Sequence, residues 1–142
     1  TGVRGRRPQG NSAQRISHID DVVFRKLRFE KAYSFSFSRW IHEIMVIGQS
    51  DVQTIDHVSF EHCLFSLPGG CNEKPGCPSV INQHYPEYDQ HGMSDGSVLT
   101  TRFVRHFKVT DLSVSFDQTD LRDPIVHFDA LDTSESDISI NA

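Results

Sequence analysis

The residues of this chain that could bind a metal ion or react as nucleophiles gather in one segment. All three cysteines and four of the eight histidines lie between residues 57 and 91. Zinc takes four thiolate or imidazole ligands in a tetrahedron, and such a set is offered by Cys63, Cys71, Cys77 and His84. No Cys-x2-Cys knuckle is present, and the gap before His84 is longer than in a common zinc finger. Zinc is therefore one of several states that this segment allows.

The same cysteines fit two other states. In an oxidising compartment, a Cys71–Cys77 disulfide would close the loop and leave Cys63 as a buried thiol. In a reducing compartment, all three cysteines would stay reduced. A metal-dependent enzyme is the remaining alternative, and it would draw on His57, His62, His84 or His91. The chain contains no nucleophile elbow, phosphate-binding glycine loop or His-Glu-x-x-His motif, so we do not expect an enzyme.

A second arrangement of metal-ligand type lies closer to the start of the chain. His18-Ile19-Asp20 matches the first half of a site in which two histidines and one carboxylate hold iron. His-x-Asp is common by chance, and the segment around it is basic rather than typical of a pocket lining. We therefore expect no metal at these residues.

The elements that would position these residues are mostly strands. Between residues 102 and 116, apolar residues alternate with polar ones, and the alternation slips once at Thr110-Asp111. A period of two buries one face of a strand and exposes the other. Similar patterns predict strands at about 16–29, 52–67, 99–109, 111–117 and 124–131, and allow a short last strand at 138–140. The predicted fold is a mostly β domain, a small barrel or sandwich of two packed sheets, with no internal repeat.

One short helix and one long loop interrupt this pattern. Residues 38–47 have helical spacing of apolar residues, with Ser38 suited to the N-cap and Gly48 to the position after the last turn. The segment 68–98 holds four of the six prolines and five of the nine glycines. A connection of this length usually has a function or lacks a fixed structure. We predict a helix at 38–47 and an irregular loop at 68–98.

Charge divides the chain into three parts. Nine of the fourteen Lys and Arg residues lie in the first forty positions, whereas the rest of the chain is acidic. We expect a basic flexible arm at 1–15, a single β domain at 16–131 and an acidic tail at 132–142. Opposite charges at the two ends suit head-to-tail contact between copies, although a basic arm on an ordinary acidic domain gives the same composition. No apolar run approaches the ~20 residues of a membrane-spanning helix, and nucleic acid is not an expected partner.

Several short motifs resemble the haemolysin-coregulated (Hcp) tube proteins of type VI secretion. Residues 10–25 read Gly-x-x-Ala-x-Arg-Ile-x-His-x-Asp-x-Val-Val-x-Arg, which is similar to a segment that leads into a strand in that family. Residues 38–48, with Ser38 first and Gly48 last, are similar to the family's helix. Residues 107–115 and 124–131 resemble its later strands. Together the matching pieces cover about half of the chain, but Ser38-Arg39 replaces the family's Ser-Pro and the loop 68–98 is long for it.

The resemblance implies assembly rather than chemistry. It implies a small β-barrel with one flanking helix, whose copies form a homo-oligomeric ring. Stacked rings would form a tube that is assembled in the cytoplasm, then secreted, and that carries effector proteins. The arm 1–15 would contact the neighbouring ring, and Arg15, His18 and Asp20 would hold the base of that arm through charge-assisted hydrogen bonds. The same three residues would equally serve to stabilise their own loop within one subunit. The alternative function is that of a monomeric β-sandwich binding module, whose Cys- and His-rich loop 68–98 is pinned by zinc or a disulfide.

Overall fold

The computed structural model describes residues 18–30, 44–72 and 95–141, and all statements about the structure refer to these ranges. Within them the chain forms eight strands and no helix. The strands are β1 (Ile19–Arg25), β2 (Arg28–Phe29), β3 (Ile44–Ile47), β4 (Ile55–Gly69), β5 (Gly96–Arg102), β6 (Val104–Gln118), β7 (Asp123–Phe128) and β8 (Ser134–Asn141). The prediction of a mostly β fold with two sheets is confirmed.

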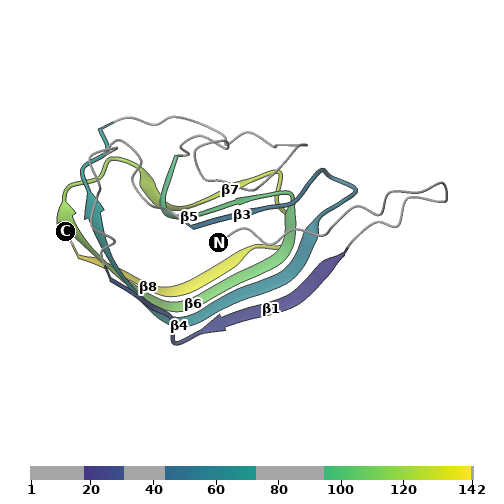
Figure 1. The fold of residues 1–142 in the computed structure, drawn as a ribbon, viewed down its shortest axis with the longest axis horizontal. Helices are drawn as coiled ribbons and strands as arrows, with labels where there is room; N and C mark the ends of the chain where they lie inside the picture. The colour runs from purple at the N-terminus through teal and green to yellow at the C-terminus, as the bar shows by residue number, and fades with distance from the viewer. Residues whose placement is uncertain (1–17, 31–43, 73–94, 142) are drawn as a thin grey trace.

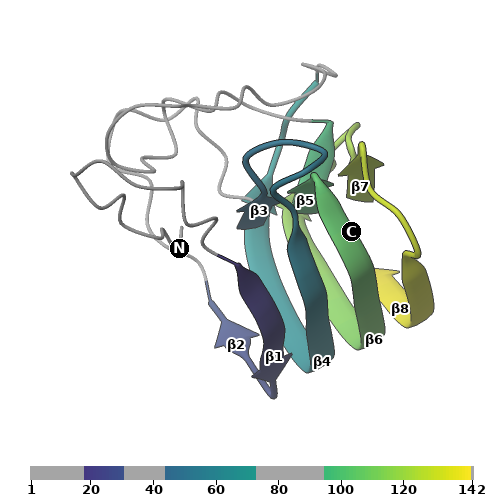
Figure 2. The same ribbon diagram turned by 90° about the vertical axis from the view of Figure 1, so that its right-hand side faces the viewer.

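The strands belong to two sheets in which every pairing is parallel. Sheet A has the order β1-β4-β6-β8, and β2 pairs with β4 further along the same edge as β1. Sheet B has the order β3-β5-β7. The chain moves from sheet B to sheet A three times, from β3 to β4, from β5 to β6 and from β7 to β8 (Figure 1, Figure 2). Each such passage is one coil, and the described strands therefore stack as a parallel β-solenoid.

The strands of sheet A bend at two aligned positions. The bends carry residues with positive φ that lie side by side on neighbouring coils, five positions apart within each strand. The first corner consists of Asp21, His57, His106 and Asp132, and the second corner consists of Lys26, His62, Asp111 and Asp137. Asp, Asn and His tolerate the left-handed region better than most residues, which suits these two sets.

Each bend interrupts the alternation of side chains, so that two successive residues point outward. In β4, for example, Phe60 and Cys63 are both buried, whereas Glu61 and His62 between them are not. The same interval recurs in β6, where Val109 and Leu112 are buried around the second corner. The chain thus contains an internal repeat, which contradicts the expectation from the sequence. The repeat is hidden because the connections between coils have unequal lengths.

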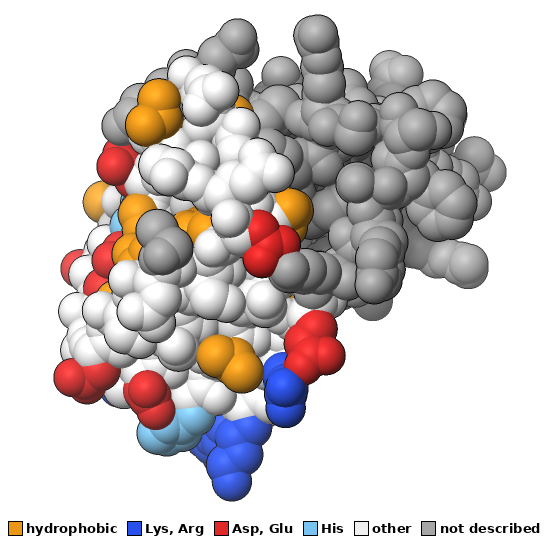
Figure 3. Space-filling model, turned by 90° about the vertical axis from the view of Figure 1, so that its left-hand side faces the viewer, with side chains coloured by type: hydrophobic (Ala, Val, Ile, Leu, Met, Phe, Trp, Pro, Cys, Tyr) orange, Lys and Arg blue, Asp and Glu red, His pale blue; other side chains and the backbone are white. Residues whose placement is uncertain are grey.

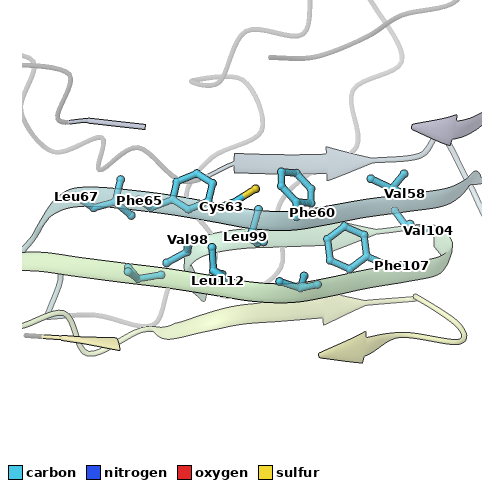
Figure 4. Close-up of a cluster of buried hydrophobic side chains, with 12 residues drawn as sticks. Val58, Phe60, Cys63, Phe65, Leu67, Val98, Leu99, Val104, Phe107 and Leu112 are labelled. Atoms are coloured by element: carbon cyan, nitrogen blue, oxygen red, sulfur yellow. The ribbon is translucent and has the colours of Figure 1, made fainter. Parts of the chain in front are cut away.

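The inward side chains form ladders along the stack of coils (Figure 4). One ladder runs through Phe24, Phe60 and Val109, and the first two rings stack with centroids 4.6 Å apart. Val98 and Leu99 of sheet B complete the core from the opposite side. Most of the buried side chains are apolar, so the hydrophobic effect holds the two sheets together; the buried polar residues are Ser97, Thr100, Thr101 and Arg122.

Several predicted boundaries differ from the structure. The break expected at Thr110 between two strands lies instead at Phe103, between β5 and β6. The predicted helix 38–47 is wrong for its last four residues, which form β3 and pair with Leu99–Arg102; residues 38–43 lie outside the described ranges. Gly48, expected after a helix, follows β3 instead, where a Cβ atom would lie 2.4 Å from the Phe103 carbonyl oxygen. Parts of the predicted loop 68–98 belong to strands, since β4 ends at Gly69 and β5 starts at Gly96.

The acidic segment 132–142 contributes a strand rather than a free tail. Ser134–Asn141 forms β8 and pairs with β6 from Lys108 to Ser115. Most of its side chains are exposed, as the sequence predicts, because β8 lies at an edge of sheet A. The arm 1–15 lies outside the described residues.

Candidate functional site

Among the described residues, one group of side chains that could hold a metal ion lies at the first corner. Asp20 and Asp21 come from β1, and His57 comes from the neighbouring strand β4. The parallel register places Asp20 opposite Asp56, so that Asp21 and His57 are neighbours across the two strands. The His57 Nδ1 atom lies 2.7 Å from Asp20 Oδ1. We call Asp20, Asp21 and His57, together with His18 and Asp56 beside them, the corner site.

His18 adds a second imidazole to this group. Its Nε2 atom lies 3.6 Å from Asp20 Oδ2 and 3.7 Å from Asp56 Oδ2. The side chains of His18 and His57 are each about half exposed, at 53% and 52%. The corner site is therefore open to solvent and combines two imidazoles with three carboxylates.

The next coil extends the row of imidazoles. The rings of His57 and His106 stack with centroids 4.5 Å apart and an angle of 14° between their planes. His106 Nδ1 lies 3.6 Å from Oδ2 of Asp132, a residue in the connection between β7 and β8. A shallow hollow adjoins this row, and Asp21, His57, His106 and Asp132 belong to its lining. Along the first corner, carboxylates thus stand at both ends of a pair of stacked histidines.

The hydrogen bond from His57 also affects the acidity of its partner. It lowers the pKa of Asp20 below the usual value of 3.8, and the backbone N–H of Asp21 and the nearby histidines act in the same direction. Partial burial opposes this effect. The Asp20 carboxylate is consequently ionised over the whole physiological range of pH and available as an anionic ligand.

The second corner has the same backbone but a different charge. His62 Nδ1 lies 2.7 Å from Asp111 Oδ2, the same separation as between His57 and Asp20. The β1 residues beside it are Arg25 and Lys26 rather than two aspartates. Arg25 Nε donates a 2.8 Å hydrogen bond to Glu61 Oε2, and this bond lowers the pKa of Glu61. The second corner thus has the same kind of His–Asp hydrogen bond as the first corner, but without the two aspartate carboxylates of β1.

The residues predicted from the sequence are only partly brought together. His18 Nε2 lies 3.6 Å from Asp20 Oδ2, whereas Arg15 lies outside the described ranges, so the role of these three residues at the base of the arm stays a prediction. Cys63 is buried in β4, and its thiol faces the carbonyl oxygens of Phe24 and Glu61 at 3.6 and 3.5 Å.

Cys71 is buried just beyond the end of β4, and its N–H donates to Asp120 Oδ2. Cys77, His84 and His91 lie outside the described residues. A zinc or disulfide arrangement of the cysteines therefore stays a prediction.

Sequence reasoning missed that His57 and Asp21 join His18 and Asp20. The two halves of the corner site are separated by 36 residues between Asp20 and His57, and only the register of β1 against β4 brings them together. A usable signal was present: a polar pair precedes an inward valine both at Asp20-Asp21-Val22 and at Asp56-His57-Val58. Aligning these two tripeptides would have placed the histidine beside the aspartates.

Comparison with known proteins gives no further assignment: no family model, curated protein or solved structure matches the chain. Among the described residues there is no helix with the length and apolar character needed to cross a membrane.

Proposed function

We propose that this chain is a non-enzymatic solenoid domain that assembles head to tail with copies of itself through the outer strands of sheet A. Among the described strands, β1 forms one edge of the sheet and β8 forms the other. An edge strand presents N–H and C=O groups that a further strand can pair with. A contact between two different edges is heterologous, and it produces rings or open stacks.

The observation that carries this proposal is the equal spacing of the corners at the two edges. The residues with positive φ are Asp21 and Lys26 in β1, and Asp132 and Asp137 at β8, five positions apart in each case. If β1 of a second copy lay beside β8, both bends would align and the parallel ladder would continue. Register in a sheet is specified by such a match of inward and outward positions.

Charge at the second corner favours the same register. Lys26 on β1 would face Asp137 of the neighbouring copy, and Arg25 would face Ser136. Figure 3 shows Lys and Arg side chains at the lower end of one face, with histidine and carboxylate side chains beside them. At the first corner, Asp21 would face Asp132, which is repulsive. The second corner therefore supplies the electrostatic attraction of the interface.

The inner ladder limits how strongly copies can associate. The ladder through Phe60 and Val109 ends at Glu135 on β8, and Glu135 Oε1 lies 2.9 Å from His127 Nε2. His127 Nδ1 is in turn 2.7 Å from Thr101 Oγ1. Covering an inward carboxylate with another coil costs free energy, and inward charges are a known means of protecting sheet edges. We therefore expect reversible association rather than unlimited growth.

The resemblance to the haemolysin-coregulated proteins gives the proposal a finer form. In that form the copies close into a ring, the rings stack into a secreted tube, and the tube carries effectors. The support for this form is the set of sequence motifs at 10–25, 107–115 and 124–131, together with the two different edges that ring closure requires. The motif at 38–48 gives no support, because its residues Ile44–Ile47 form β3 and not a helix. A ring would be one discrete oligomer, whereas open stacking would give a series of sizes.

Native mass at micromolar concentration, measured by light scattering and sedimentation, tests the proposal. We expect particles several times heavier than 16.1 kDa. Lys26→Asp and Asp137→Lys should each shift the distribution toward the monomer, and the double variant should restore it because the charges are exchanged. Both positions tolerate these residue types at positive φ, since Lys and Asp already occupy them.

A monomer at all concentrations, or single variants that associate like the original chain, would contradict the proposal. A strict monomer would favour the alternative from the sequence, a β binding domain whose Cys- and His-rich loop 68–98 is pinned by zinc or a disulfide. Circular dichroism of each variant checks that the fold is retained.

A further inference from the structure

We propose that the corner site binds one divalent transition-metal ion through His57 and Asp20, with a third ligand from Asp21 or His18. This inference does not depend on self-assembly, because all five residues of the corner site belong to one copy. It reverses the expectation from the sequence, which considered His18 and Asp20 without the histidine that the fold adds to them.

The ligand atoms are close enough to share one ion. One ligand atom each from Asp20, Asp21 and His57 lies within 4.8 Å of the other two. Bonds of about 2.0–2.2 Å to a tetrahedral ion place ligand atoms about 3.3–3.5 Å apart. The separation of 2.7 Å between His57 Nδ1 and Asp20 Oδ1 must therefore widen, whereas the other separations are at most 4.8 Å. These side chains are exposed, so that neighbouring atoms leave them room to rotate.

The charge of the site favours a cation. Asp20, Asp21 and Asp56 surround the two imidazoles with three carboxyl groups. The nearest basic residue in the same ladder is Arg105, opposite Asp56, and its Nη2 atom donates to the carbonyl oxygen of Asp51. Among the described residues, neither Asp20 nor Asp21 forms an ion pair with Lys or Arg.

The mixture of donors indicates the class of metal. Imidazole and carboxylate together suit zinc, nickel, copper and iron, whereas calcium and magnesium prefer oxygen ligands alone. The exposed position leaves room for water at the remaining coordination sites. Because Asp20 and Asp21 lie on β1 and His57 lies on β4, the ion would connect the outermost described strand of sheet A to the rest of the sheet. Binding only to the folded chain would then raise its stability.

Calorimetric titration of the full chain with Ni²⁺ under reducing conditions at neutral pH tests this site. We expect one ion per chain. His57→Asn and Asp20→Asn should each weaken binding by at least tenfold, and Asn is suited to the positive φ of residue 57. His62→Asn is the matched control, because it removes an identical His–Asp hydrogen bond at the second corner without changing Ni²⁺ affinity. His18→Gln and Asp21→Asn identify the third ligand, and one of them should also weaken binding.

A second readout separates this site from binding by thiols. Ni²⁺ should raise the thermal midpoint of the original chain and of His62→Asn, but not that of His57→Asn. The proposal is overturned by an absence of saturable binding, by equal affinity in His57→Asn and His62→Asn, or by unchanged affinity in both third-ligand variants. In the first case the His57–Asp20 contact is only a surface hydrogen bond.

Discussion

The ring of Phe60 stacks on the ring of Phe24 from the neighbouring coil, with an angle of 19° between their planes. Phe60 is 1% exposed and also contacts Phe107 at a centroid distance of 5.8 Å. Phe60→Ala should lower the free energy of unfolding by about 3–5 kcal/mol, because it leaves a cavity between two coils. Leu64→Ala on the outer face of β4 is the control, with an expected change below about 1 kcal/mol. Urea denaturation measures both, and equal losses would contradict the inward assignment of Phe60.

The second-corner residue His62 tests whether the bends require a particular backbone. Its φ is 54°, in the region that β-branched residues avoid. His62→Asn and His62→Val both remove the contact with Asp111, so their difference isolates the backbone. We expect the valine variant to be less stable than the asparagine variant by about 1–2 kcal/mol. Equal stabilities in urea would show that the bend does not constrain this position.

A substitution of Glu135 tests whether its inward carboxylate restrains the association of copies. Replacing it with valine extends the inner apolar ladder to the last coil and should increase the mean native mass at a fixed concentration. Ser136→Val, one position along the same strand, alters the outward side and serves as the control. Sedimentation velocity measures both variants. A mass for Glu135→Val that equals or falls below that of the original chain would argue against an inward charge that restrains stacking.

Lowering the pH should remove the contribution that the ionised Asp20 carboxylate makes to the free energy of unfolding. Because the folded chain lowers the pKa of Asp20 below 3.8, the unfolded chain binds its proton more tightly, and stability falls as the pH drops through this range. The contribution is fully present above the ordinary pKa. Asp20→Asn should therefore show a shallower loss of stability than the original chain below about pH 5. Chemical denaturation at several pH values checks this, and parallel curves would exclude the effect.

Glu61 offers an independent comparison for this acid dependence. Its pKa is also lowered, chiefly by the hydrogen bond from Arg25, so Glu61→Gln should change the curve in the same direction. The two carboxylates lie at different corners, and their effects on the slope should add.

The strands were predictable because their alternation is local. The slip at Thr110-Asp111 was visible in the sequence, but it was interpreted as a break between two strands. In the structure it is the second corner within one continuous strand, β6. A residue in the left-handed region lets the strand turn while its hydrogen-bonded ladder continues, and a pattern of period two cannot represent that conformation.

The predicted helix failed for a different reason. Ile44 and Met45 fit helical spacing, and nothing nearby in the sequence shows that Leu99 and Thr100 will pair with them. Pairing over such a separation outweighs a local preference. The corner site was missed for the same reason, because the position of His57 beside Asp20 depends on the register of β4 and not on its own segment.

The connections between coils differ in length, which shows where the number of residues can change without a change in the sheets. Most of the buried side chains belong to the strands, so the two sheets accept connections of different lengths between successive strands. Peptides or whole modules could be grafted into such joints, and the rise of about 4.8 Å from each strand to its neighbour would remain the same. The coils would then hold the inserted segments at regular intervals along the stack, whatever the length of each segment.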